Sequence, residues 1–159
     1  MIALHTHPDS WIEQAPKRCS ASREIAASPS AVWEVLADHE SWPQWFPVVQ
    51  EMTVTGAASG VGARRRVRLP GLVLEEEFLA WEVGSRYAFR AVSASRRMFA
   101  SINERVTIEG RRGGGSLVTY DQAFAPSWWF HLPFKVMQRR FRRDLGDAMH
   151  GLAGRTESA

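Results

Sequence analysis

Four polar side chains fall on strand-like segments at positions that apolar residues would normally occupy. Glu104 shares one face of its segment with Ile102 and Val106, because successive side chains of a strand point to opposite sides. The same alternation places three more polar groups on inward faces, and these are Arg23, Arg65 and Gln122. A carboxylate, two guanidinium groups and an amide are therefore predicted to point towards the interior.

An inward carboxylate needs a partner, because an isolated buried charge is costly. We therefore predict that Glu104 contacts Arg23, Arg65 or the Gln122 amide. Such groups form a polar floor that orients a ligand's carbonyl or hydroxyl groups, or Glu104 and Arg23 serve as acid and base in an aldol-type cyclisation. Two structural alternatives stay open, namely a buried ion pair without a ligand and a β-bulge that turns Glu104 outward.

The histidines and the cysteine give no recognisable catalytic motif. His39 is interpreted as a surface or helix-capping residue, and His150 as a partly exposed residue of the last helix. Cys19 lies on the inward phase of a strand and is interpreted as a small core residue. The pair His5 and His7 has no third ligand at a suitable spacing, so no metal site is predicted.

The elements that must position these groups follow the order strand, helix, six strands and long helix. Residues 17–26 are strand-like, and Ser28 followed by Pro29 is typical of a helix start. Residues 39–47 contain two prolines and predict one turn and a bend. The remaining strand candidates, separated by glycine-containing turns, are Val48–Thr55, Ala63–Leu69, Leu72–Glu82, Arg86–Ala94, Met98–Glu109 and Ser116–Phe124.

The last segment changes to a helical period after Pro126. Its apolar residues recur at spacings of three and four over about five turns, and they are Phe134, Met137, Phe141, Leu145, Met149 and Leu152. An antiparallel sheet with one apolar face must have that face covered, and this helix is the long amphipathic one in the sequence. The predicted fold class is therefore α+β.

Three short motifs lie where predicted strands and helices follow one another. They are residues 25–33 (IAASPSAVW), residues 38–45 (DHESWPQW) and residues 115–120 (GSLVTY). Together they resemble the helix-grip fold of the START/Bet v 1-like superfamily, also called SRPBCC, and most closely its polyketide cyclase/dehydrase-like branch. The resemblance covers about residues 17–152. It implies a curved antiparallel sheet of about seven strands around a long C-terminal helix, with two short helices after the first strand.

The resemblance also implies a cavity between the sheet and the last helix. The walls expected from aromatic and apolar positions are Tyr87, Phe89, Phe134, Met137 and Phe141, and the rim expected at the cavity mouth is Trp45, Phe46 and Trp129. Arg23, Arg65, Glu104 and Gln122 would be its polar anchors. For the aromatic residues of the helix, simple core packing remains the alternative. No metal and no covalent cofactor is implied.

The segment 126–134 is the most hydrophobic stretch and precedes a helix with five basic residues. Tryptophan beside arginine is typical of a membrane interface, so weak membrane-surface contact is one hypothesis and coverage of the cavity mouth is the other. Nucleic acid is not expected as a partner. The basic run 64–68 is split across two strand faces, and residues 75–77 (EEE) are predicted to pair with it.

The sequence as a whole predicts a ligand-binding domain at residues 17–153, with an N-terminal extension at 1–16 and a tail at 154–159. The single cysteine suits a cytoplasmic protein, and the expected assembly is a monomer or a homodimer. The expected ligand is a small hydrophobic or aromatic molecule of the polyketide, lipid or isoprenoid kind. A non-catalytic carrier or sensor is the leading interpretation, beside a polyketide cyclase or dehydratase and a peripheral lipid or quinone carrier.

Overall fold

An eight-stranded antiparallel sheet forms the centre of the structure, a computed structural model in which residues 1–158 are described. The path of paired strands is β2-β8-β7-β6-β5-β4-β3, and β1 pairs with β6. The strands are β1 (Ile2–Ala3), β2 (Lys17–Ile25), β3 (Glu51–Val54), β4 (Arg64–Leu69), β5 (Leu72–Glu82), β6 (Arg86–Ala94), β7 (Phe99–Gly110) and β8 (Ser116–Pro126).

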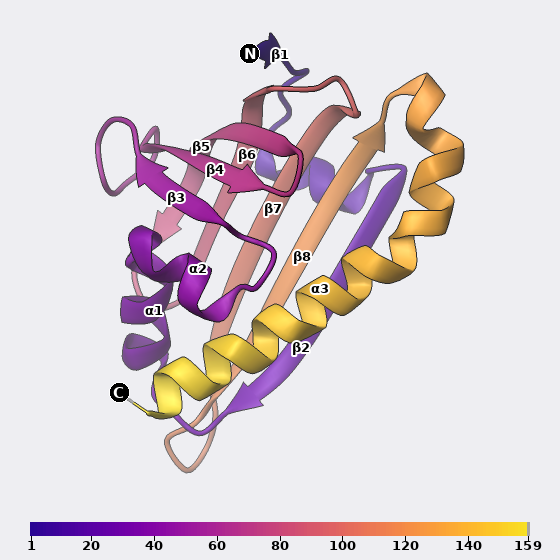
Figure 1. The fold of residues 1–159 in the computed structure, drawn as a ribbon. Helices are drawn as coiled ribbons and strands as arrows, with labels where there is room; N and C mark the ends of the chain where they lie inside the picture. The colour runs from indigo at the N-terminus through magenta and orange to yellow at the C-terminus, as the bar shows by residue number, and fades with distance from the viewer. Residues whose placement is uncertain (159) are drawn as a thin grey trace.

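One long helix, α3 (His131–Glu157), runs diagonally across a face of this sheet (Figure 1). The short helices α1 (Pro29–Ala37), η2 (His39–Ser41), α2 (Trp42–Trp45) and η3 (Trp128–Phe130) lie on the same side of the sheet or at its edge. The short helix η1 (Asp9–Glu13) packs against β6, β7 and β8 instead. The apolar core fills the space between α3, α1, α2 and the curved sheet. The predicted helix-grip architecture is confirmed.

Local sequence explains where the elements begin and end. The Ser28 hydroxyl accepts a hydrogen bond from the Ala31 N–H at 3.3 Å, so it caps α1 as predicted, and Pro29 fills the first helical position. The turn between β4 and β5 depends on Gly71, whose φ of +74° is unfavourable for other residues. Strands β5 and β6 have the predicted bounds.

Strand β3 is shorter than the predicted segment Val48–Thr55. The backbone N–H of Val49 donates to the Phe46 carbonyl at 2.9 Å, so the chain is still turning where a strand was expected. The basic run of β4 pairs with the acidic run of β5 as predicted: Arg64 lies opposite Glu77, and Arg66 lies opposite Glu75.

After β1, residues 7–13 cover part of the sheet face that α3 leaves free. The side-chain amide of Asn103 donates to the backbone carbonyls of His7 and Pro8 at 3.3 and 3.1 Å. Arg105, two residues further along β7, forms an ion pair with Glu13 at 2.7 Å. The N-terminal segment therefore packs through directed polar contacts as well as through the buried side chain of Ile12.

At the other end of the chain, α3 continues to Glu157 and so includes most of the segment predicted as a tail. The Glu157 carboxylate accepts a hydrogen bond from the Ala26 N–H at 3.0 Å.

Cys19 is buried in β2, and burial raises the pKa of its thiol. No helix within residues 1–158 has the length and apolar character needed to cross a membrane.

Candidate functional site

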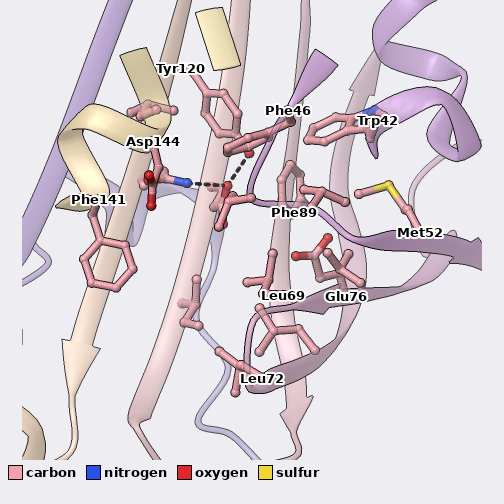
Figure 2. Close-up of a pocket in the computed structure, with 18 of the residues that line it drawn as sticks. Trp42, Phe46, Met52, Leu69, Leu72, Glu76, Phe89, Tyr120, Phe141 and Asp144 are labelled. Carbon is pink, nitrogen blue, oxygen red and sulfur yellow. Dashed lines mark hydrogen bonds between the residues drawn. The ribbon is translucent and has the colours of Figure 1, made fainter. Parts of the chain in front are cut away.

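A cavity lies between α3, the segment from α2 to β3, and the sheet face that α3 covers. The cavity volume is about 90 Å³, and the empty space including its solvent-open mouth is about 680 Å³. Figure 2 shows Phe141 and Asp144 on α3 on one side and Trp42, Met52 and Glu76 on the other. Apolar side chains form most of the lining, among them Val49, Val67, Leu72, Leu74, Phe89, Phe99, Ile102, Phe124 and Leu145.

The opening of the cavity is marked by lining residues that remain partly exposed. Val48 and Leu69 lie at the β3–β4 side, and Phe141 and Asp144 lie on α3. The other lining side chains are buried. A ligand would therefore enter between the β3–β4 edge and the middle of α3.

Arg65 is the central cation of the cavity wall and is only 1% exposed. Its Nε donates to the Glu76 carboxylate at 2.7 Å, and its Nη1 lies 3.1 Å from His39 Nδ1. The guanidinium carbon also lies 4.4 Å from the centre of the Trp42 ring and 4.3 Å from that of Phe89. Ion pairing and two aromatic faces thus compensate for the burial of this charge.

Glu104 is the second buried polar centre. Its Oε2 accepts hydrogen bonds from the Tyr120 hydroxyl and, at 3.1 Å, from the Gln122 amide (Figure 2). The predicted contact with the Gln122 amide is confirmed, and the alternative in which a bulge turns Glu104 outward is wrong. Neither bond uses Oε1, so one carboxyl oxygen is left for another partner.

Burial and neighbouring charge raise the pKa of Glu104 and lower the pKa of His39. Burial, followed by repulsion from Glu76, raises the pKa of Glu104 to about 7. Burial, followed by the nearby Arg65 cation, lowers the pKa of His39 to about 4. Burial also raises the pKa of Glu76 although Arg65 opposes this shift. Near neutrality Glu104 can therefore hold or release a proton, whereas His39 is neutral.

His39 was predicted to be a surface or capping residue, and this prediction is wrong. The side chain is buried against Phe78 and Trp81, with ring centroids at 5.2 and 5.7 Å. Because a guanidinium can only donate, Nδ1 must be the acceptor of the bond from Arg65. The neutral imidazole is therefore a structural support of Arg65.

The titration of Glu104 leads to a testable pH dependence of stability. Its pKa is raised in the folded state, so its stabilising contribution is complete below about pH 4.5 and is lost as the pH rises through about 7. His39 acts oppositely: its contribution is complete above about pH 6.5 and is lost as the pH falls through about 4. The two contributions partly cancel in the wild-type protein.

We expect Glu104→Gln to remove the pH-dependent contribution of Glu104 to stability and to leave that of His39. Between about pH 5 and about pH 8, the free energy of unfolding of the wild type should fall by about 2–3 kcal/mol relative to the variant. Urea unfolding at several pH values measures this difference. Glu109→Gln, an exposed change on the same strand, is the control and should follow the wild type. Parallel pH profiles for wild type and Glu104→Gln would contradict the prediction.

Six of the predicted binding residues line the cavity together, and they are Phe46, Arg65, Phe89, Glu104, Gln122 and Phe141. Trp45 and Tyr87 do not. Trp45 is buried where α2 meets α3, and Tyr87 is buried under Trp33 of α1, with ring centroids 5.7 Å apart. Tyr87 shares its strand face with Phe89, but the covering helix closes that end of the face.

The other predicted residues lie further away. Phe134 packs inside an aromatic cluster with Phe124 at 5.6 Å, and Met137 is only partly buried on the same helix. Trp129 is 48% exposed and lines a separate surface hollow. Arg23 is not a hydrogen-bond partner of Glu104, and its Nη1 lies 3.3 Å from His150 Nε2 on α3.

The lining residues missed by sequence reasoning include four with polar groups, which are Trp42, Glu76, Tyr120 and Asp144. A signal existed for three of these four, and Tyr120 shares its strand face with Gln122. Glu76 alternates with Leu74 and Phe78, and Asp144 follows Phe141 by three positions on the apolar stripe of α3. Both are polar residues on an apolar face, which is the pattern that identified Glu104.

Known proteins resemble this chain in sequence and in fold. The sequence model of a family described as polyketide cyclase/dehydrase and lipid transport matches residues 17–157. An uncharacterized protein of Mycobacterium tuberculosis (strain ATCC 25618 / H37Rv) is 33% identical over 144 aligned residues, and the match covers 86% of each chain.

Solved structures share the fold at lower identity. A START superfamily protein from Mycobacterium smegmatis has a TM-score of 0.74 at 16% identity, over 89% of this chain and 97% of its own. An aromatase/cyclase, Zhui, from Streptomyces sp. R1128 has a TM-score of 0.72 at 14% identity, over 89% and 93%. At these identities the likeness extends to the fold alone.

Proposed function

Since the chain belongs to the polyketide cyclase/dehydrase and lipid transport family, we propose that it binds a small hydrophobic or aromatic molecule in the cavity, as a carrier or sensor. One observation carries the proposal: an apolar cavity with a few converging buried polar groups. Ligand sites of proteins have this composition, in which apolar walls provide affinity and a few polar groups fix orientation.

The polar groups favour a ligand with a carbonyl or hydroxyl group. Oε1 of Glu104 takes neither the Tyr120 nor the Gln122 bond. When protonated it would donate to a ligand carbonyl, and when ionised it would accept from a ligand hydroxyl. Arg65 also lines the cavity and adds a cation to its wall.

Filling the cavity tests the proposal. Val67 is buried in β4 and lines the cavity, so Val67→Phe adds bulk where a ligand would lie. With 2-naphthol as a planar hydroxylated probe, we expect calorimetry to give measurable binding to the wild type with a negative heat-capacity change. The variant should bind at least about tenfold more weakly, which is about 1.4 kcal/mol.

The matched control is Val83→Phe, since Val83 lies in the β5–β6 turn and is 74% exposed. It makes the same change in residue type without entering the cavity and should bind like the wild type. Equal binding by a folded Val67→Phe protein would overturn the cavity as the binding site. Separately, native mass spectrometry of protein purified from its own host would identify the natural ligand class.

A second candidate function is proton transfer to a bound poly-β-ketone. The specific observation that favours it is Glu104, a carboxyl with a pKa of about 7 beside the cavity. General acids and bases work best with a pKa near the operating pH. Conversion of such a ketone by the wild type and not by Glu104→Gln would support a cyclase or dehydratase over a carrier.

A further inference from the structure

An exposed apolar patch lies where α3 begins, outside the cavity. Trp128, Leu132 and Val136 are 87%, 74% and 81% exposed, and Trp129 beside them is 48% exposed. We call these four residues the tryptophan patch. Large apolar side chains that cluster on a surface mark interaction sites more often than scattered ones do.

Packing of the sheet does not account for the tryptophan patch. The opposite side of the same segment already supplies Phe130 and Phe134 to the core, where Phe130 lies 5.3 Å and Phe134 6.1 Å from the Phe99 ring. Trp128, Leu132 and Val136 follow one another at intervals of four residues, so they form a stripe on the outward side. This segment is therefore apolar on both sides, which internal packing alone does not require.

Positive charge surrounds the tryptophan patch. Residues 127–143 contain Lys135, Arg139, Arg140, Arg142 and Arg143 and no aspartate or glutamate. Two of these arginines reach acidic residues further along α3, since Arg140 lies 3.8 Å from Asp144 and Arg143 lies 3.9 Å from Asp147. Lys135 and Arg139 lie nearest the patch along the helix and are exposed.

A second element adds to the positive charge around the tryptophan patch. The β6–β7 connection carries the exposed residues Arg96 and Arg97. Arg97 lines a surface hollow together with Trp128 and Trp129, so residues far apart in the sequence meet at the patch. The apolar side chains are thus flanked by cations from two separate elements.

We propose that the tryptophan patch docks the protein on the surface of a membrane that contains anionic lipids. Tryptophan and aliphatic side chains enter the boundary between headgroups and acyl chains, while lysine and arginine attract anionic headgroups. A second copy of the chain is a poorer occupant, because a symmetric interface would place the same cations opposite one another. Nucleic acid is also poorer, because Leu132 and Val136 offer no aromatic face for base stacking.

Co-sedimentation with phospholipid vesicles tests the proposal directly. Wild-type protein should bind vesicles of phosphatidylcholine with phosphatidylserine and bind phosphatidylcholine alone at least about tenfold more weakly. Binding should fall as salt is raised from about 0.1 M to about 1 M, because the screening length shortens from about 10 Å to about 3 Å. No ligand is added, so the outcome is independent of the proposed cavity function.

Two double variants separate the apolar and the charged contributions. Trp128→Ser with Leu132→Ser should reduce binding to the anionic vesicles by at least about tenfold. Lys135→Glu with Arg139→Glu should remove the preference for anionic lipid. All four side chains are exposed, so circular dichroism and thermal unfolding should match the wild type.

Matched controls lie at the other end of the sheet. Arg111→Glu with Arg112→Glu makes the same charge change in the exposed β7–β8 turn, far from the start of α3 (Figure 1). Val83→Ser changes an equally exposed apolar residue. Both should bind as the wild type does. Equal loss in the controls, or a wild-type dimer that the Trp128/Leu132 variant dissociates without any vesicle binding, would overturn the proposal.

Discussion

Replacing Arg65 by methionine is expected to lower the free energy of unfolding by about 3–5 kcal/mol. The change would leave the Glu76 carboxylate buried without its cation, and Glu76 is 4% exposed. It would also remove the guanidinium from between the Trp42 and Phe89 rings. Urea unfolding at neutral pH measures this loss.

A neighbouring ion pair supplies the control for this prediction. Arg66 and Glu75 pair at 2.7 Å across the same two strands, but their side chains are 54% and 33% exposed. Arg66→Met should cost at most about 1 kcal/mol, because surface ion pairs contribute little. The double variant Arg65→Met with Glu76→Leu should recover part of the loss. Similar losses for Arg65→Met and Arg66→Met would contradict the assigned role of the buried pair.

The second large effect is expected at Gly151, where α3 crosses α2. A Cβ at this position would overlap the Trp45 carbonyl oxygen and lie 2.8 Å from the carbonyl carbon. Because these neighbours are backbone atoms of a short helix, they cannot move aside as a flexible side chain would. Gly151→Ala should therefore destabilise the protein by about 3 kcal/mol or more, at the upper end of overpacking costs.

Another glycine of α3 gives the opposite expectation. Gly154 is exposed, and a Cβ added to it would have no neighbouring atom within 4 Å. Gly154→Ala should stabilise by about 0.5–1 kcal/mol, because alanine loses less conformational entropy in a helix. Thermal unfolding of both variants measures the difference. Stabilisation by Gly151→Ala would mean that the two helices lie further apart than described.

The order of elements could be predicted because each depends on a local pattern. Alternation predicted the inward faces of β2, β4, β6, β7 and β8, and the spacing of apolar residues predicted the apolar face of α3. The inward orientation of Glu104 could be predicted because β7 has no register shift at that position. Its contact with Gln122 followed from the cost of an unpaired buried carboxylate.

The extent of the cavity could not be predicted in this way. Alternation states which face a residue lies on, but not which helix covers that part of the face. Tyr87 and Phe89 have the same phase, yet Trp33 covers the first and the cavity adjoins the second. His39 and Trp45 lie in a bend without any period, so their burial is set entirely by tertiary contacts.

The burial of Cys19 has a practical consequence for spectroscopy. It is the single cysteine of the sequence, it is 3% exposed, and burial raises the pKa of its thiol. The thiolate that reacts with maleimides is therefore both scarce and shielded at neutral pH. A cysteine introduced at Val136 could be labelled with a fluorophore while the native residue stays in place. The emission of that label would then report on its immediate surroundings in real time.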